Sequence, residues 1–221
     1  KKRGGGEGAN EALKPPQAWQ QVRDPLEPER FTLSEGEEKA KVIEAFMATL
    51  LPTIQVESVQ RVQNMSMWQS YAVKRQTVLQ REKDGAANQG AKKTSRYERV
   101  WLFHGTDEHT VPKIIEMGFN RSFCGKNATA FGKGVYFARD AAYSSSAQYS
   151  RPDAQGVQHM FLVRVVIGEY CAGKRDQLTP DVRQGHQLYD TTVNKIQDPS
   201  IYVTYHDAQA YPEYLVSFKQ A

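Results

Sequence analysis

The sequence is poor in the features that define several large protein classes. It has only 2 cysteines in 221 residues, Cys124 and Cys171, too few for a disulfide framework or a cysteine-ligated metal cluster. No hydrophobic run approaches the roughly eighteen apolar residues that span a membrane. The net charge of +4 permits a polyanionic partner without demanding one. We therefore expect an intracellular globular protein with reduced thiols and no membrane partner.

The common catalytic signatures are also absent. A P-loop needs Gly-Lys followed by Ser or Thr, but the GKN at 125–127 ends in asparagine. The GKG at 132–134 lacks the third glycine of a dinucleotide-binding fingerprint. There is no Cys-x-x-Cys, His-Glu-x-x-His or Gly-x-Ser-x-Gly, and His104 and His109 are spaced off one helical face. These absences reduce the number of enzyme classes to be considered and favour a site without a metal.

Hydrophobic periodicity and breaker residues predict the organisation of the first hundred residues. Residues 1–17 (KKRGGGEGANEALKPPQ) are predicted to form a flexible basic tail or linker. The predicted elements after it are a strand at 29–33, a helix from a Ser34–Glu37 capping box to Pro52, a strand at 54–64, a helix at 65–83 and a mobile loop at 84–97.

Strands dominate the rest of the chain. They are expected at 99–105, 134–139, 159–170, 200–206 and 213–218. One short helix is expected from Thr110 to Gly118, with Pro112 in its first turn, and another after Asp140. Residues 171–190 are expected to form a long loop. The pattern predicts a single α+β domain over residues 18–221.

The segment LFHGT, at 102–106, places a histidine and a glycine at the end of an apolar strand. One interpretation is an edge histidine followed by a turn. The other is a ligand site, because a strand-end histidine can exchange a hydrogen bond with a sugar hydroxyl. Gly105 would leave its backbone N–H and C=O bare for a ligand amide. His104 and Gly105 are therefore candidate binding residues.

The segment AFGKGVYFARDAAYSSSAQYS, at 130–150, raises the same choice. The glycines permit a tight turn into a strand whose alternation places Val135 and Phe137 on one face and Tyr136 on the other. Tyr136 and Tyr149 could sandwich a flat heterocycle, with Ser144 donating to its amide oxygen. They could equally be core tyrosines with satisfied hydroxyls.

These segments, together with SIYVTYHDAQAYPEYLV at 200–216, resemble the catalytic domain of the poly(ADP-ribose) polymerase-like ADP-ribosyltransferases, in particular the mono-ADP-ribosylating branch often joined to macro domains. The resemblance covers roughly residues 20–221. It implies a diphtheria-toxin-like α+β fold, with two apposed antiparallel sheets, flanking helices and an NAD cleft between them. It also implies no metal, and a cytoplasmic or nuclear location.

The resemblance assigns roles residue by residue. His104 corresponds to the histidine that contacts the adenosine-side ribose, and Gly105 to the glycine whose backbone pairs with the nicotinamide carboxamide. Tyr136 matches the tyrosine of the family's His-Tyr-Glu triad, Tyr149 its stacking partner, and Ser144 the serine that hydrogen-bonds the amide. The resemblance further implies that the NAD surface includes Thr106, Phe137 and Ala138. Residues 151–156 would belong to a flexible loop over the pocket.

The chain departs from the family pattern at Ile201. Aligned on Tyr205 and on Ala208-Gln209, this position holds the glutamate of polymerising members, and Glu213 in the next strand should not reach it. Isoleucine has no acceptor for a ribose hydroxyl. The resemblance therefore implies transfer of single ADP-ribose units. The chain also has no room for the helical regulatory subdomain of the DNA-damage-activated members.

The expected function is mono-ADP-ribosylation from NAD, with release of nicotinamide. Protein Asp or Glu side chains, including the enzyme's own, are the expected acceptors, since an anionic acceptor can stabilise the oxocarbenium-like ribose. Two alternatives remain: a catalytically silent NAD-binding module, and modification of RNA or DNA phosphate ends. The second would need a basic rim at the cleft, for which Lys126, Lys133 and Arg139 are candidates.

Overall fold

The computed structural model describes residues 13–22, 24, 26–50, 53–86, 97–123 and 129–220. Its strands are β1 (Glu29–Thr32), β2 (Ile54–Gln63), β3 (Glu98–Thr106), β4 (Val135–Ala138), β5 (Gln158–Val166), β6 (Tyr170–Ala172), β7 (Val182–Gln184), β8 (Gln187–Leu188), β9 (Thr191–Val193), β10 (Ile201–Thr204) and β11 (Ala210–Gln220). Its helices are α2 (Glu37–Met47), α3 (Met65–Ala86), α4 (Val111–Met117) and α5 (Ala141–Ser144), with 3-10 turns η1 (Arg121–Phe123) and η2 (Asp207–Gln209).

The described strands form a nine-stranded sheet in the order β1-β2-β11-β5-β3-β4-β10-β9-β6, and β7 and β8 form a separate hairpin. The α+β fold is confirmed. The two sheets expected from the sequence are two halves of this one sheet. The halves meet between β3 and β4, where Phe103 and Ala138 form the only pair between these two strands. The pairing is antiparallel except between β6 and β9, which run parallel. Beyond the pair of Phe103 and Ala138, the residues of β3 and β4 do not pair with each other.

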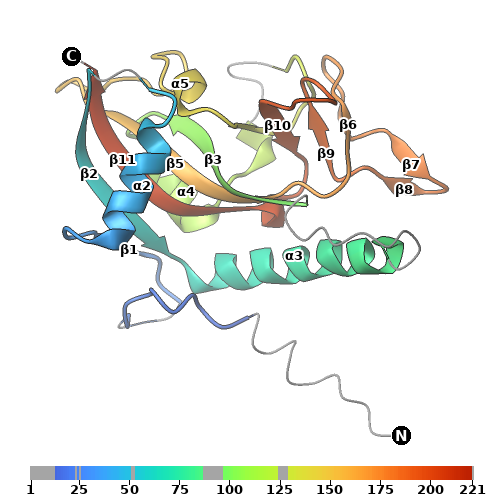
Figure 1. Ribbon diagram of the computed structural model, residues 1–221, viewed down its shortest axis with the longest axis horizontal. Helices are drawn as coiled ribbons and strands as arrows, with labels where there is room; N and C mark the ends of the chain where they lie inside the picture. Colours follow the sequence, from blue (N-terminus) through green and yellow to red (C-terminus); the bar gives the residue numbers. More distant parts are fainter. Residues whose placement is uncertain are drawn as a thin grey trace, which may run out of the picture.

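Strand β5 shows how one sheet serves two cores. Its side chains alternate, so Met160 and Leu162 pack in the cluster that includes α2, whereas Phe161 and Val163 pack in the cluster that includes α4. Figure 1 shows α2 lying across β2 and β11, and the long α3 crossing below the sheet. Because both faces are covered, β5 contains the uninterrupted apolar run MFLV at 160–163.

Several predicted boundaries are wrong. Helix α2 begins after Gly36 with no side-chain cap, so the Ser34–Glu37 capping box does not form, and the helix ends at Met47, before Pro52. Helix α3 continues to Ala86, into the expected loop. The expected loop at 171–190 contains parts or all of β6, β7 and β8. The residues of β7 and β8 are all exposed, which removes the alternation on which a strand prediction depends.

Some expectations fall on residues outside the described part of the chain: residues 1–12 of the tail, 87–96 of the loop, and 124–128 with Cys124 and Lys126. The tail's residues 13–17 are described, and there the carbonyl of Lys14 accepts a hydrogen bond of 2.8 Å from the indole of Trp68. Cys171 is a buried free thiol. Among the described helices, none combines the length and the apolar character that a membrane crossing requires.

Candidate active site

A cleft of about 410 Å³ lies where β3 and β4 separate, and α4 and α5 contribute to its walls. Every site residue predicted from the sequence lines it: His104, Gly105, Thr106, Tyr136, Phe137, Ala138, Ser144, Tyr149 and Ile201. The structure therefore brings together residues that lie up to ninety-seven positions apart, from His104 to Ile201. A concave site lined by apolar walls and a few polar groups suits a small organic ligand.

The opening of the cleft follows from strand pairing. Beyond the pair of Phe103 and Ala138, β3 continues to Thr106 beside β5 but has no further partner in β4. The β4 side of His104 and Gly105 therefore faces the cleft rather than another strand. Unpaired strand edges offer backbone donors and acceptors to a ligand.

His104 is held in one tautomer. Its Nδ1–H donates to the carbonyl of Tyr136 at 2.9 Å, and its ring meets Phe119 edge-on with centroids 5.0 Å apart. Burial lowers the pKa of His104, so the imidazole is favoured in its neutral form. With Nδ1 donating, Nε2 is left as an acceptor that suits a sugar hydroxyl.

Gly105 is a position where no side chain fits. A Cβ there would lie 2.4 Å from the carbonyl oxygen of Ser144 and 2.7 Å from Oγ of Ser150. The segment 144–150 thus packs directly on the backbone of β3, which fixes one wall of the cleft. Ser144 is buried, and its hydroxyl donates to the carbonyl of Phe103 at 3.2 Å. To donate to a ligand amide, as expected from the sequence, this hydroxyl must rotate.

Strand β4 divides its side chains as predicted. Val135 and Phe137 enter the apolar core, whereas Tyr136 packs against a different cluster that contains Ile201. The hydroxyl of Tyr136 accepts from the N–H of Phe131 at 2.9 Å and donates to the carbonyl of Gly132 at 2.8 Å. The turn preceding β4 therefore fixes the orientation of the tyrosine ring.

Tyr149 stacks on Tyr143, which the sequence analysis did not assign to the site. Tyr143 and Tyr149 both line the cleft. The pair forms at the end of α5, a helix of four residues, so no helical period links the two positions. The only sequence signal for Tyr143 is its place in a segment already rich in tyrosine and serine.

Ile201 forms an apolar part of the cleft. It is 4% exposed, pairs with Ala138 across β4 and β10, and packs with Val203 and Tyr205. As expected, Glu213 does not take its place. The Glu213 carboxylate lies 2.8 Å from Arg164 and accepts from the indole of Trp101 at 2.6 Å, and this glutamate does not line the cleft.

The charged residues of the cleft were not singled out from the sequence as ligand contacts. Asp107 is the one carboxylate among the described residues that line it, and Thr110 donates to both of its oxygens at 2.9 Å. Lys113 and Arg151 also line the cleft. Arg151 begins the loop that the resemblance places over the pocket, whereas Lys113 carries no sequence signal beyond an exposed position on α4.

The loop at 151–156 contains an ordered turn. Oδ1 of Asp153 accepts from the N–H groups of Gln155 and Val157, each at 2.8 Å, and the Asp153 N–H donates to the carbonyl of Val157 at 2.9 Å. Ser150, just before the loop, donates to the carbonyl of His159 at 2.6 Å. These bonds tie both ends of the loop to the neighbourhood of β5.

The fold and the cleft together define a class, the α+β domains whose ligand cleft lies where two halves of a sheet separate. Comparison with known proteins identifies the family. The family model of the poly(ADP-ribose) polymerase catalytic domain matches residues 36–177. The chain belongs to this family, whose members transfer ADP-ribose and use NAD as co-substrate.

The named relatives agree with one another. Human protein mono-ADP-ribosyltransferase PARP14 is 41% identical over 75% of this chain and 9% of its own length. Mouse protein mono-ADP-ribosyltransferase PARP10 is 36% identical over 95% of this chain and 21% of its own. Human protein mono-ADP-ribosyltransferase PARP12 is 35% identical over 86% and 26%. The chain thus spans about a quarter or less of the length of these curated relatives.

Proposed function

We propose that this domain transfers one ADP-ribose unit from NAD to a protein acceptor and stops, with release of nicotinamide. The observation that carries the proposal is Ile201, which stands buried and without a polar group in the cleft, beside Ala138. By the resemblance, polymerising members hold a glutamate there. The names of the relatives, protein mono-ADP-ribosyltransferases, support the same conclusion.

The cleft residues have distinct roles in this proposal. Nε2 of His104 accepts from a ribose hydroxyl, the bare backbone of Gly105 pairs with the carboxamide, and Tyr136 and Tyr149 flank the nicotinamide ring. The bond from ribose C1′ to the ring nitrogen breaks, and its electron pair returns to that nitrogen, which becomes neutral. Because the leaving group needs no proton, orientation of the ring is the main task of these residues.

The acceptor in this proposal is an Asp or Glu carboxylate. Its oxygen supplies the electron pair for the new bond to C1′, so the step needs no base. Support comes from the cleft itself. Its one carboxylate among the described residues, Asp107, already accepts two hydrogen bonds from Thr110, so an acceptor that needs no base suits this site. An anionic acceptor adds the negative charge that the oxocarbenium-like ribose lacks.

The alternatives have less support. The cleft is open rather than filled, and His104 remains, which does not favour a silent module. For phosphate ends, the basic rim is weakened because Arg139 is paired with Asp140 and with Asp198, the latter at 2.6 Å.

Incubation with labelled NAD followed by denaturing electrophoresis tests the proposal. We expect a sharp labelled band, one nicotinamide released per label, and loss of label in His104→Ala. The exposed His186→Ala in the β7–β8 turn is the matched control and should label normally. A high-molecular-weight smear would overturn the reading of Ile201, and label only on added 5′-phosphorylated RNA would favour nucleic-acid ends. Label carried solely on serine or cysteine would overturn the carboxylate acceptor.

A further inference from the structure

Two buried hydroxyls behind the cleft, on Thr192 of β9 and Tyr205 after β10, converge on one carbonyl. Oγ1 of Thr192 lies 2.6 Å from the carbonyl oxygen of Phe131 and 3.0 Å from the hydroxyl of Tyr205. The Tyr205 hydroxyl is 3.4 Å from the same carbonyl. Each hydroxyl has one proton: that of Thr192 is used in the short contact with Phe131, and that of Tyr205 is directed at the same carbonyl and at Oγ1 of Thr192.

Phe131 connects Thr192 to Tyr136, a residue of the cleft. Its carbonyl is held by Thr192, and its N–H donates to the hydroxyl of Tyr136. The next carbonyl, of Gly132, accepts the proton of that same hydroxyl. One turn of backbone therefore connects Thr192 to the ring of Tyr136.

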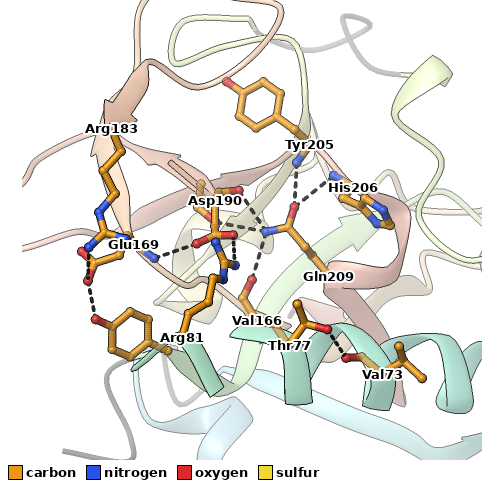
Figure 2. Close-up of polar contacts among 12 residues, drawn as sticks. Val73, Thr77, Arg81, Val166, Glu169, Arg183, Asp190, Tyr205, His206 and Gln209 are labelled. Atoms are coloured by element: carbon orange, nitrogen blue, oxygen red, sulfur yellow. Dashed lines mark hydrogen bonds and ion pairs between the residues drawn. The ribbon is translucent and has the colours of Figure 1, made fainter. Parts of the chain in front are cut away.

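Close packing also restricts the turn at Phe131 and Gly132. Gly132 has φ of +124°, and a Cβ on it would lie 1.8 Å from the hydroxyl of Tyr205. Thr192 is completely buried, and Tyr205 is 9% exposed. The main-chain N–H of Tyr205 donates to the side chain of Gln209, as Figure 2 shows, so the tyrosine is anchored at its backbone as well.

We propose that Thr192 and Tyr205 are positioning residues: through Phe131 and Gly132 they hold the ring of Tyr136 in the orientation that receives nicotinamide. This inference rests on the proposed function for the identity of the ligand, but the linkage itself is independent of it. Without Thr192, the carbonyl of Phe131 loses its short hydrogen bond and keeps the longer contact with the Tyr205 hydroxyl, so the turn that orients Tyr136 is held less firmly.

The test compares wild type with Thr192→Val, which keeps shape but removes the hydroxyl, and Thr192→Ser, which keeps the hydroxyl. Thr191→Val is the matched control: Thr191 is the preceding, equally buried residue of β9, and its hydroxyl contacts Gln209 instead. Strand alternation points the two threonines to opposite faces. Melting temperature, NAD affinity by calorimetry, and KM and kcat for NAD are measured for each protein.

Both valine variants should lower the melting temperature, because each loses a buried hydrogen bond. Only Thr192→Val should weaken NAD binding and raise KM, by about tenfold, the order expected for one hydrogen bond. Thr192→Ser, which keeps the hydroxyl, should have the NAD affinity and the KM of wild type. Equal NAD affinity in Thr192→Val and Thr191→Val would overturn the proposal, since it would leave Thr192 with a purely structural role.

Amide hydrogen exchange at Phe131 separates this inference from the proposed function. Its N–H, bonded to Tyr136, should exchange faster in Thr192→Val than in Thr191→Val, with or without NAD. If wild type bound no NAD, the proposed function would fail while the exchange result still decided the linkage. Unchanged exchange in Thr192→Val would refute the linkage even in an active enzyme.

Discussion

Tyr143 and Tyr149 stack face to face at the cleft, with ring centroids 4.9 Å apart, planes inclined by 24° and hydroxyl oxygens 2.7 Å apart. Tyr149 is the expected stacking partner of a flat ring, and Tyr143 supports it. No ring fits between two rings at this spacing, so a ligand must lie on the open face of the pair. The rigidity of the pair reduces the entropy that Tyr149 would lose on binding.

Removal of that support should weaken binding. Tyr143→Ala should lower the affinity for nicotinamide and for NAD about threefold to tenfold, the effect of losing one aromatic pair. Tyr143→Phe keeps the stack and loses only the bond between hydroxyls, so its affinity should stay closer to wild type. Isothermal calorimetry distinguishes the two, and equal losses would show that the hydroxyl contact rather than stacking holds Tyr149.

Gly105→Ala should both destabilise the fold and close the site. The new Cβ would meet the backbone oxygen of Ser144, which cannot move aside as a flexible side chain could. We expect a loss of about 1–3 kcal/mol in the free energy of unfolding, typical of overpacking, and no measurable NAD binding. Gly185→Ala, where the φ of +57° is strained but nothing lies near, is the comparison. If Gly105→Ala bound NAD like wild type, the backbone of Gly105 would not contact the ligand.

How far the sequence predicts this molecule depends on how local each cause is. Helix α4 was predicted from Thr110 to Gly118, and it occupies Val111–Met117 between those two residues, because proline and glycine act within one turn. The alternation around Tyr136 was equally local. Strands β7 and β8 were missed because both faces are exposed and nothing selects an apolar side.

The site divides in the same way. His104, Gly105 and Tyr136 lie in segments with strong motifs and were predicted. Thr192 could not be found, because its contact with Phe131 joins residues 61 positions apart and depends on how β9 lies beside the turn. A threonine in a polar segment has no signal that distinguishes a positioning role from an ordinary strand position.

The pH dependence of stability should include a contribution from His104. Burial holds the folded-state pKa of His104 below its ordinary value of 6.5. Well above pH 6.5 the residue is neutral in both states. As the pH falls through 6.5, the unfolded chain takes up a proton that the folded one resists, so stability is lost. Urea denaturation from pH 7.5 downward should therefore show a steeper loss in wild type than in His104→Gln.

His159 does not affect the comparison of wild type with His104→Gln. Burial also lowers the pKa of His159, and its loss of stability has the same sign, but it is present in both proteins and cancels in their difference. Parallel curves for wild type and His104→Gln would mean that His104 has an ordinary pKa in the folded state.

Gln209 should be among the least replaceable residues outside the cleft. Its Oε1 accepts from the N–H groups of Tyr205 and His206 at 3.2 and 3.0 Å, and its Nε2 donates to the carbonyls of Val166 and Asp190 at 3.1 and 3.0 Å (Figure 2). Gln209→Ala should cost about 3 kcal/mol, since several buried groups lose partners. Gln209→Glu, though isosteric, should cost at least as much, because an oxygen would then face two carbonyls. Chemical denaturation measures both, and a mild effect of Gln209→Glu would show that the donor side matters little.

Replacing Ile201 by glutamate should not create a polymerase. The side chain would emerge among Ala138, Val203 and Tyr205, in a cluster of buried hydrophobic residues. Burying an uncompensated polar group of this kind costs about 1–3 kcal/mol by mutational data, and the carboxyl group would be favoured in its protonated form. A protonated carboxyl is a poor acceptor for the ribose hydroxyl that must be activated for chain growth.

We expect Ile201→Glu to unfold at a lower temperature and still give a sharp labelled band, with Ile201→Leu as the control for changed packing. A smear from Ile201→Glu would instead mean that Ile201 alone limits the product to one unit, and that the rest of the cleft is already suited to a growing chain.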